Sequence, residues 1–299
     1  MACRLPKRSR KVALLEGVTA GALFGTAAVL IRLLPGLNVF SIAFWRLVIA
    51  SLILSVLILS LRKPFGSNLL RENLRETLVL GFLLGLHFML FVSAVMNTTI
   101  LNATVLVNTT PIWSMFVSAL VFNVKPSQLA ILGVSVSFVG VGIIAYSDFV
   151  SSQGVLTPNF MGDLEAVLAA VAEAFYLSYG RKTRSRVPLL SLMLIIYLAS
   201  ALTILAAGVL ASSSFTIPSK LEIMLPLIGL GILPTALAHT FYFSSLSNLK
   251  SYETATMALL EPIGATMLGV IIFAEIPNVL FVAGAVFVLG GIISVAVRE

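Results

Sequence analysis

Charged side chains inside long apolar stretches are the residues of this chain that could do chemistry. Glu173 and Glu261 each lie near the middle of such a stretch, and Arg46 lies inside a third. A carboxyl group there could carry a proton, bind the ammonium group of a substrate, or form a structural hydrogen bond to a neighbouring segment. The guanidinium of Arg46 suits a carboxylate or phosphate. A salt bridge within the fold, or an outward reach to the surface, is slightly favoured over that role.

Two prolines stand in similar surroundings and are expected to kink or gate the chain. Pro262 directly follows the second glutamate. A helical proline leaves the carbonyl four positions earlier, here that of Ala258, without its N–H partner. Pro111 would free the carbonyl of Val107 in the same way, but the residue before it is the neutral Thr110. The polar pathway is therefore predicted to be asymmetric.

His87 and His239 each stand in an apolar stretch and could titrate near neutrality, or serve as neutral hydrogen-bond donors. No second His, Cys or Asp lies beside either of them at ligand spacing along the chain, so we expect no metal site. Several aromatic residues could line a cavity for an apolar or cationic group, although packing or lipid contact is the commoner role. They are Phe88, Phe91, Trp113, Phe175, Tyr176, Tyr179, Phe241 and Tyr242.

These residues must be positioned by membrane-spanning helices. Hydrophobic residues make up 59% of the 299 positions and charged residues 10%, too little charge for a soluble surface. A spanning helix needs about 20 mainly apolar residues, and backbone groups in hydrocarbon must bond within their own element. We therefore predict an all-α integral membrane protein with ten transmembrane helices. They lie at about 12–33, 39–61, 77–97, 101–122, 127–146, 162–180, 188–211, 222–246, 253–273 and 278–297.

The distribution of positive charge predicts the orientation of these helices. If the N-terminus is cytoplasmic, every Lys and Arg except Arg32, Arg46 and Lys220 falls in the inner connections or termini. By the positive-inside rule both termini are then cytoplasmic. The net charge of +7 is explained by contact with anionic lipid, and a nucleic-acid partner is not expected.

The chain also reads as two related halves, 1–149 and 152–299. The spacing between two prolines of the first half recurs between two prolines of the second half, and the glycines that follow recur at the same distances. The first set is Pro111, Pro126, Gly133 and Gly140, and the matching set is Pro262, Pro277, Gly284 and Gly291. Five helices per half is an odd number, so the second half would enter the membrane with opposite orientation. Such inverted repeats are typical of secondary transporters that work by alternating access.

The motifs around the two prolines resemble a known family. Residues 259–277 (LLEPIGATMLGVIIFAEIP) are similar to the second repeat of the drug/metabolite transporter superfamily, EamA type, and 108–126 to its first-repeat counterpart. The Gly-rich segment 17–32 and the FWR at 44–46 support the match. The chain departs at Val124–Lys125, where an acidic residue is common, and at Phe175–Tyr176, where Trp is frequent. The resemblance implies a ten-helix transporter, close in length to the aromatic-amino-acid and methyl viologen exporters.

The sequence therefore predicts a secondary transporter that exports amino acids, aromatic or otherwise apolar, across a bacterial or archaeal cytoplasmic membrane. Alternatives are a channel, a receptor, a membrane assembly subunit, a membrane-embedded enzyme, or a transporter of another class such as sugar phosphates or organic cations. The chain has no P-loop and no H-E-x-x-H motif, and its single cysteine is Cys3. We expect no enzyme activity and no cofactor.

Overall fold

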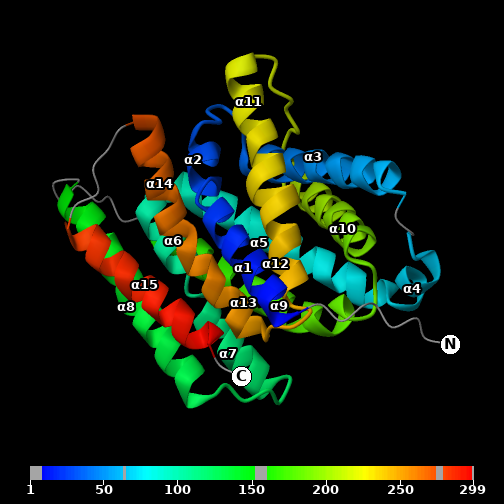
Figure 1. The fold of residues 1–299 in the computed structure, drawn as a ribbon. Coiled ribbons are helices and arrows are strands. Elements are labelled where there is room, and N and C mark those ends of the chain that lie inside the picture. Colours follow the sequence, from blue (N-terminus) through cyan, green and yellow to red (C-terminus); the bar gives the residue numbers. More distant parts are fainter. Residues whose placement is uncertain (1–8, 63–64, 152–159, 274–278, 298–299) are drawn as a thin grey trace.

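The computed structural model describes residues 9–62, 65–151, 160–273 and 279–297, and these residues form helices without any strand (Figure 1). The predicted all-helical class is confirmed. The first half contains α1 (Arg10–Phe24), α2 (Ala27–Arg32), α3 (Val39–Ser60), α4 (Ser67–Glu72), α5 (Leu74–Asn97), α6 (Ile100–Val107), α7 (Thr110–Leu120) and α8 (Gln128–Ser151).

The second half contains one long helix, then a series with π and 3-10 segments. They are α9 (Phe160–Arg184), α10 (Leu189–Leu210), α11 (Leu221–Leu230), the π-helix η1 (Gly231–His239), α12 (Thr240–Ser245), α13 (Ser251–Met257), the 3-10 turn η2 (Ala258–Leu260), α14 (Glu261–Phe273) and α15 (Val279–Ala296). Pro277 and Ser152 lie outside the described residues.

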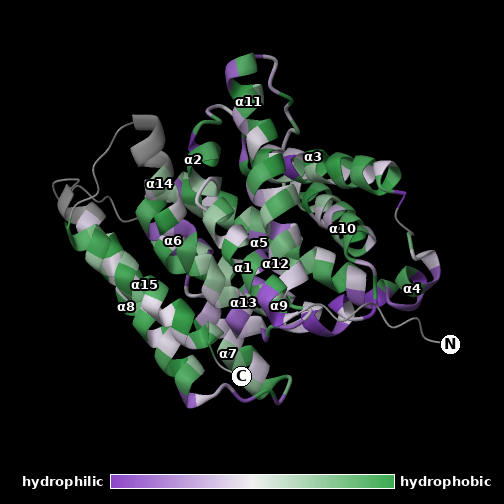
Figure 2. Cartoon of the chain, viewed as in Figure 1, coloured by the Kyte–Doolittle hydropathy of each residue, from purple (hydrophilic) through white to green (hydrophobic). Residues whose placement is uncertain are grey.

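Eight helical stretches of the described chain are long and apolar enough to cross a membrane. They are Arg10–Arg32, Val39–Ser60, Leu74–Asn97, Ile100–Leu120, Gln128–Ser147, Leu189–Leu210, Leu221–Ser245 and Val279–Ala296. Hydrophobic residues run along most of the helices, while hydrophilic ones gather near α4 and around the ends of α9 and α13 (Figure 2). The other two predicted spans fall on α9 and on α13–α14, which are also helical. Their crossing of the membrane stays a prediction.

Both prolines act on the backbone, but the carbonyls they affect find new partners. The chain tightens into a 3-10 turn at η2, where the backbone N–H of Glu261 donates to the carbonyl of Ala258. The carbonyl of Val107 instead accepts from the hydroxyl of Thr110, at 2.8 Å. Each carbonyl thus has one hydrogen-bond partner, as apolar surroundings favour.

Helices α8 and α15, the last of each half, lie side by side apart from most of the bundle (Figure 1). Their glycines meet: a Cβ atom added at Gly140 would lie 2.6 Å from the carbonyl oxygen of Gly284, and one at Gly133 would lie 2.8 Å from that of Gly291. Only glycine permits this approach of two backbones. These glycines therefore serve the packing of α8 against α15.

Candidate functional site

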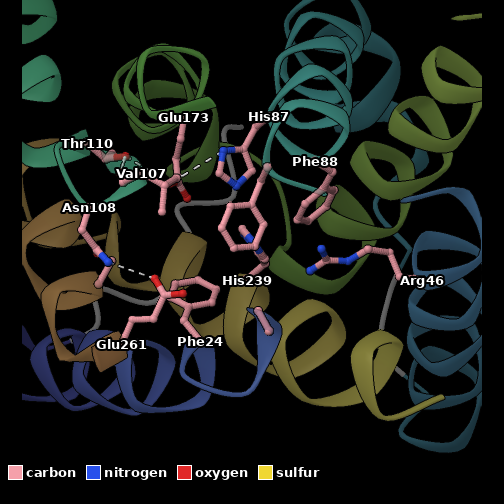
Figure 3. Close-up of a pocket in the computed structure, with 13 residues that line it drawn as sticks. Phe24, Arg46, His87, Phe88, Val107, Asn108, Thr110, Glu173, His239 and Glu261 are labelled. Carbon is pink, nitrogen blue, oxygen red and sulfur yellow. Dashed lines mark hydrogen bonds and ion pairs between the residues drawn. The ribbon is translucent and has the colours of Figure 1, made fainter. Parts of the chain in front are cut away.

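A small pocket of about 30 Å³ lies among helices from both halves of the chain (Figure 3). It is bounded by α1, α2, α3, α5, the α6–α7 junction, α9, η1 and the η2–α14 junction. The residues that line it are Phe24, Ala27, Arg46, His87, Phe88, Phe91, Val107, Asn108, Thr110, Glu173, His239, Ala258 and Glu261. Both glutamates, the arginine and both histidines proposed from the sequence meet here, although they come from separate helices.

Glu261 begins α14, directly after the 3-10 turn that precedes Pro262. Its side chain is 6% exposed, and its Oε2 accepts a hydrogen bond from Nδ2 of Asn108 at 3.1 Å. Asn108 lies between α6 and α7, where the helix is interrupted, and also donates to the carbonyl of Thr104 at 2.8 Å. Sequence analysis missed Asn108; its position three residues before Pro111, in an apolar stretch, was the available signal.

Glu173 projects from α9 and has weaker contacts. Its Oε2 lies 3.4 Å from the hydroxyl of Thr110, which already donates to a backbone carbonyl, and 3.9 Å from Nδ1 of His87. That nitrogen is 3.0 Å from the carbonyl oxygen of Ala169, so Nδ1 carries the proton that forms this hydrogen bond. Glu173 is therefore buried without a strong partner among the described residues.

Arg46 is 1% exposed, and its surroundings differ from the favoured expectation. It neither reaches the surface nor pairs with a carboxylate in the described part of the chain. Nε donates to the hydroxyl of Thr235 at 2.9 Å, and the guanidinium lies 4.1 Å from the centre of the Phe88 ring. Nη1 is buried without a hydrogen-bond partner. Such a nitrogen is a ready donor for an anionic group that enters the pocket.

The two histidines are brought together by α5 and η1. Their ring centres are 6.0 Å apart, and the ring of His239 meets Phe24 and Phe88 edge-on, each at 4.8 Å. Nδ1 of His239 is buried without a hydrogen-bond partner. One nitrogen of each histidine and one oxygen of Glu173 all lie within 4.8 Å of one another. The absence of ligand spacing along the chain therefore did not exclude a group of possible metal ligands in space.

Two of the aromatic candidates, Tyr176 and Trp113, do not line this pocket. The Tyr176 ring is buried against Phe243, and its hydroxyl lies 3.8 Å from the sulfur of Met193. The indole N–H of Trp113 donates to the hydroxyl of Thr109 one turn earlier, at 3.0 Å. The aromatic walls of the pocket are Phe24, Phe88 and Phe91. Phe88 and Phe91 are among the candidates from the sequence, whereas Phe24 is not.

Hydroxyl contacts join α7, α9 and α13 at one end of these helices, beyond the residues that line the pocket. The oxygen of Ser251 lies 2.6 Å from that of Ser118 and accepts from Ser178 at 3.1 Å. Nearby, Arg10 of α1 pairs with Glu253 of α13 at 3.1 Å. Every residue from Ser251 to Leu260 is buried. The charge distribution of the sequence predicts that this end faces the cytoplasm.

Comparison with known proteins identifies related sequences and folds. The family model described as the EamA-like transporter family matches twice, over residues 11–146 and 160–297. The resemblance drawn from the proline motifs is thereby confirmed. A protein solved by crystallography shares the fold, with a TM-score of 0.79 over 96% of both chains at 19% sequence identity. A search of curated proteins finds no match.

Proposed function

Because the chain belongs to the EamA-like transporter family, we propose that it is a secondary transporter that exports amino acids by alternating access. Family membership makes it a multi-pass membrane protein whose partners are a small molecule and the lipid bilayer. The amino-acid substrate, the outward direction and the cytoplasmic membrane belong to the proposal. The observation that supports an amino acid is the placement of opposite charges around one buried pocket.

The two carboxyl groups and the arginine lie on different sides of this pocket. In Figure 3, Glu173 and Glu261 flank one side, and Arg46 approaches from the other beyond His239. An amino acid carries an ammonium and a carboxylate group on one carbon. The carboxylate would meet the unpartnered Nη1 of Arg46, and the ammonium group would meet the glutamates. Each buried charge would then gain the partner that it lacks or holds only weakly.

The pocket walls favour an apolar or aromatic side chain. Phe24, Phe88 and Phe91 present ring surfaces to the pocket. Its volume of about 30 Å³ has room for little more than a water molecule, so an amino acid would enter only when the surrounding helices move apart. An organic cation would use the carboxyl groups but leave Arg46 unpaired. A sugar phosphate would use Arg46 but set its negative charge against two glutamates. The combination of charges therefore supports a zwitterion over either alternative.

The proposal is tested by competition among three analogues in proteoliposomes. Uptake of labelled phenylalanine is measured with excess phenylalanine, phenethylamine or 3-phenylpropionate; the second lacks the carboxylate and the third lacks the amine. We expect strong competition only from phenylalanine, since each analogue leaves one buried charge unpaired. Equal competition by phenethylamine would assign an organic cation, and equal competition by 3-phenylpropionate would assign an organic anion. Either result would reject the zwitterion.

The proposed architecture has ten spans, formed by the eight apolar stretches together with α9 and α13–α14. It places both termini in the cytoplasm and relates halves 1–149 and 152–299 by inversion in the membrane plane. Two matches to one family model support the repeat. Exchange of conformations between such halves would open the pocket to alternate sides of the membrane.

A further inference from the structure

The cluster of His87, Glu173 and His239 contains two imidazoles that the proposed amino-acid site does not use. Glu173 belongs to both sites, so a bound metal ion and a substrate ammonium group would compete for its carboxylate. The residues come from α5, α9 and η1, and one ligand atom of each lies within 4.8 Å of the other two. Two imidazoles and one carboxylate are the three protein ligands found at many catalytic zinc sites, where a fourth position stays open. We propose that these three residues bind a divalent transition-metal ion of the Zn²⁺ class.

The state of the two imidazoles fits this role. Nδ1 of His87 donates to the carbonyl of Ala169, which leaves Nε2 with the lone pair that a metal ion needs. A hydrogen bond from the non-ligating nitrogen to a backbone carbonyl also fixes the ring of a metal-binding histidine. His239 is 3% exposed, and its Nδ1 has no hydrogen-bond partner. A buried nitrogen of this kind is costly unless it binds something.

The geometry requires only a modest contraction. In a tetrahedral zinc site with bonds of about 2.0–2.1 Å, the donor atoms lie roughly 3.4 Å apart. The histidine rings are held, His87 by Ala169 and His239 by its two edge-on phenylalanines. Glu173 has no hydrogen bond or ion pair shorter than 3.4 Å among the described residues, so its flexible side chain is free to move toward the two rings.

The charges near the cluster also admit a cation. Glu173 contributes one carboxyl group, and Glu261 lines the same pocket. Arg46, the nearby cation, is directed toward Thr235 and Phe88 and lies on the other side of the pocket from Glu173 in Figure 3. The metal ion would join helices of both halves, because His87 belongs to the first and the other two ligands belong to the second.

The test is Zn²⁺ binding to the purified full-length protein carrying Cys3→Ala, prepared without a polyhistidine tag and treated with a chelator. Isothermal titration should give one Zn²⁺ per chain. Glu173→Gln and the double variant His87→Asn/His239→Asn should each weaken binding by at least about tenfold. Glu165→Gln is the matched control, since it removes a carboxylate from the same helix as Glu173 but not from the pocket, and it should keep the affinity.

X-ray absorption at the zinc edge of the loaded protein gives a readout that needs no variant. The chain has only two histidines, so scattering from two imidazole rings can come only from His87 and His239. We expect that signature. Failure of the protein to bind Zn²⁺, bound Zn²⁺ without imidazole scattering, or unchanged affinity in the double variant would each overturn the proposal. None of these outcomes depends on which substrate the protein transports.

Discussion

At the scale of single residues, the two carboxyl groups of the pocket differ in what holds them. Glu261 accepts a hydrogen bond from Asn108 at 3.1 Å, whereas the best contact of Glu173 is a hydroxyl 3.4 Å away that already serves another acceptor. A buried carboxyl group with weak hydrogen bonds is stabilised more by binding a ligand than one that already has a strong partner. We therefore expect Glu173 to contribute more to substrate binding, and Glu261 to contribute to both binding and the fold.

Replacing the glutamates separates these roles. Glu173→Gln keeps the size of the side chain but removes the charge that would bind an ammonium group. Exchange of amino acid in proteoliposomes should fall by roughly tenfold or more, since a hydrogen bond to a charged group is worth about 1.5–3 kcal/mol. Glu261→Gln should also lower exchange, and in addition lower the Tm because Asn108 loses a charged partner.

Glu165→Gln is the control for this series. Glu165 lies on the same helix, accepts from Ser93 at 2.8 Å and Asn97 at 3.0 Å, and does not line the pocket. The exchange rate per folded molecule of Glu165→Gln should match that of the unaltered protein. Full exchange activity in both Glu173→Gln and Glu261→Gln would show that the pocket carboxyl groups only brace the fold.

At the scale of elements, packing depends on glycines at particular helix faces. Gly140 of α8 faces the backbone of α15, while a Cβ atom at Gly142, two residues later, would meet nothing within 4 Å. Both glycines lie in the same helix, so replacing either one changes the intrinsic helix propensity equally. A difference in stability between the two variants therefore reports the contact between α8 and α15.

Gly140→Val should destabilise the protein and Gly142→Val should not. Forcing a side chain into a well-packed contact costs about 1–3 kcal/mol, whereas the exposed site has room. The measurement is the Tm of each variant in the same detergent. Equal Tm values for the two variants would mean that α8 and α15 do not pack through this face.

The hydroxyl contact between α7 and α13 predicts that a disulfide can join these two helices. The hydroxyl oxygens of Ser118 in α7 and Ser251 in α13 are 2.6 Å apart. With Cys3→Ala as background, Ser118→Cys/Ser251→Cys should form a disulfide under mild oxidation and stop exchange, and reduction should restore it. Each single cysteine variant is the control. A disulfide that leaves exchange unchanged would show that these two helices do not separate at this contact during transport.

The positions of the helices could be predicted from the sequence, but their rotations about their axes could not. Apolar runs and the charges between them located the helical stretches, and the proline motifs located the interruptions near Val107 and Ala258. The π-helix at η1 contains Pro234, but a proline does not distinguish a π segment from a kinked α-helix, so the direction of His239 could not be predicted. The meeting of His87, Glu173 and His239 depends on how α5, α9 and η1 are rotated about their axes, which one sequence does not encode legibly.

At the scale of the whole molecule, the account requires one orientation in the membrane. A cysteine placed at Ser185, which is exposed between α9 and α10, should be protected from an impermeant thiol reagent added outside. Cysteines at Ser212, beyond the end of α10, and at Ser152 should react. Cys3→Ala makes the background free of thiols, since Cys3 is the only cysteine. The reverse pattern would overturn the predicted topology.

Exchange across a sealed membrane tests whether an amino acid reaches the buried pocket alternately from the two sides. Proteoliposomes are loaded with unlabelled phenylalanine or with buffer, and entry of labelled phenylalanine is followed at equal concentration outside. The binding site of a carrier returns across the membrane faster with substrate bound, so unlabelled phenylalanine inside should accelerate entry of the labelled substrate. Entry should also saturate with the outside concentration. Arg46→Gln should abolish the acceleration. Entry that neither saturates nor responds to loading would identify a channel and contradict the account.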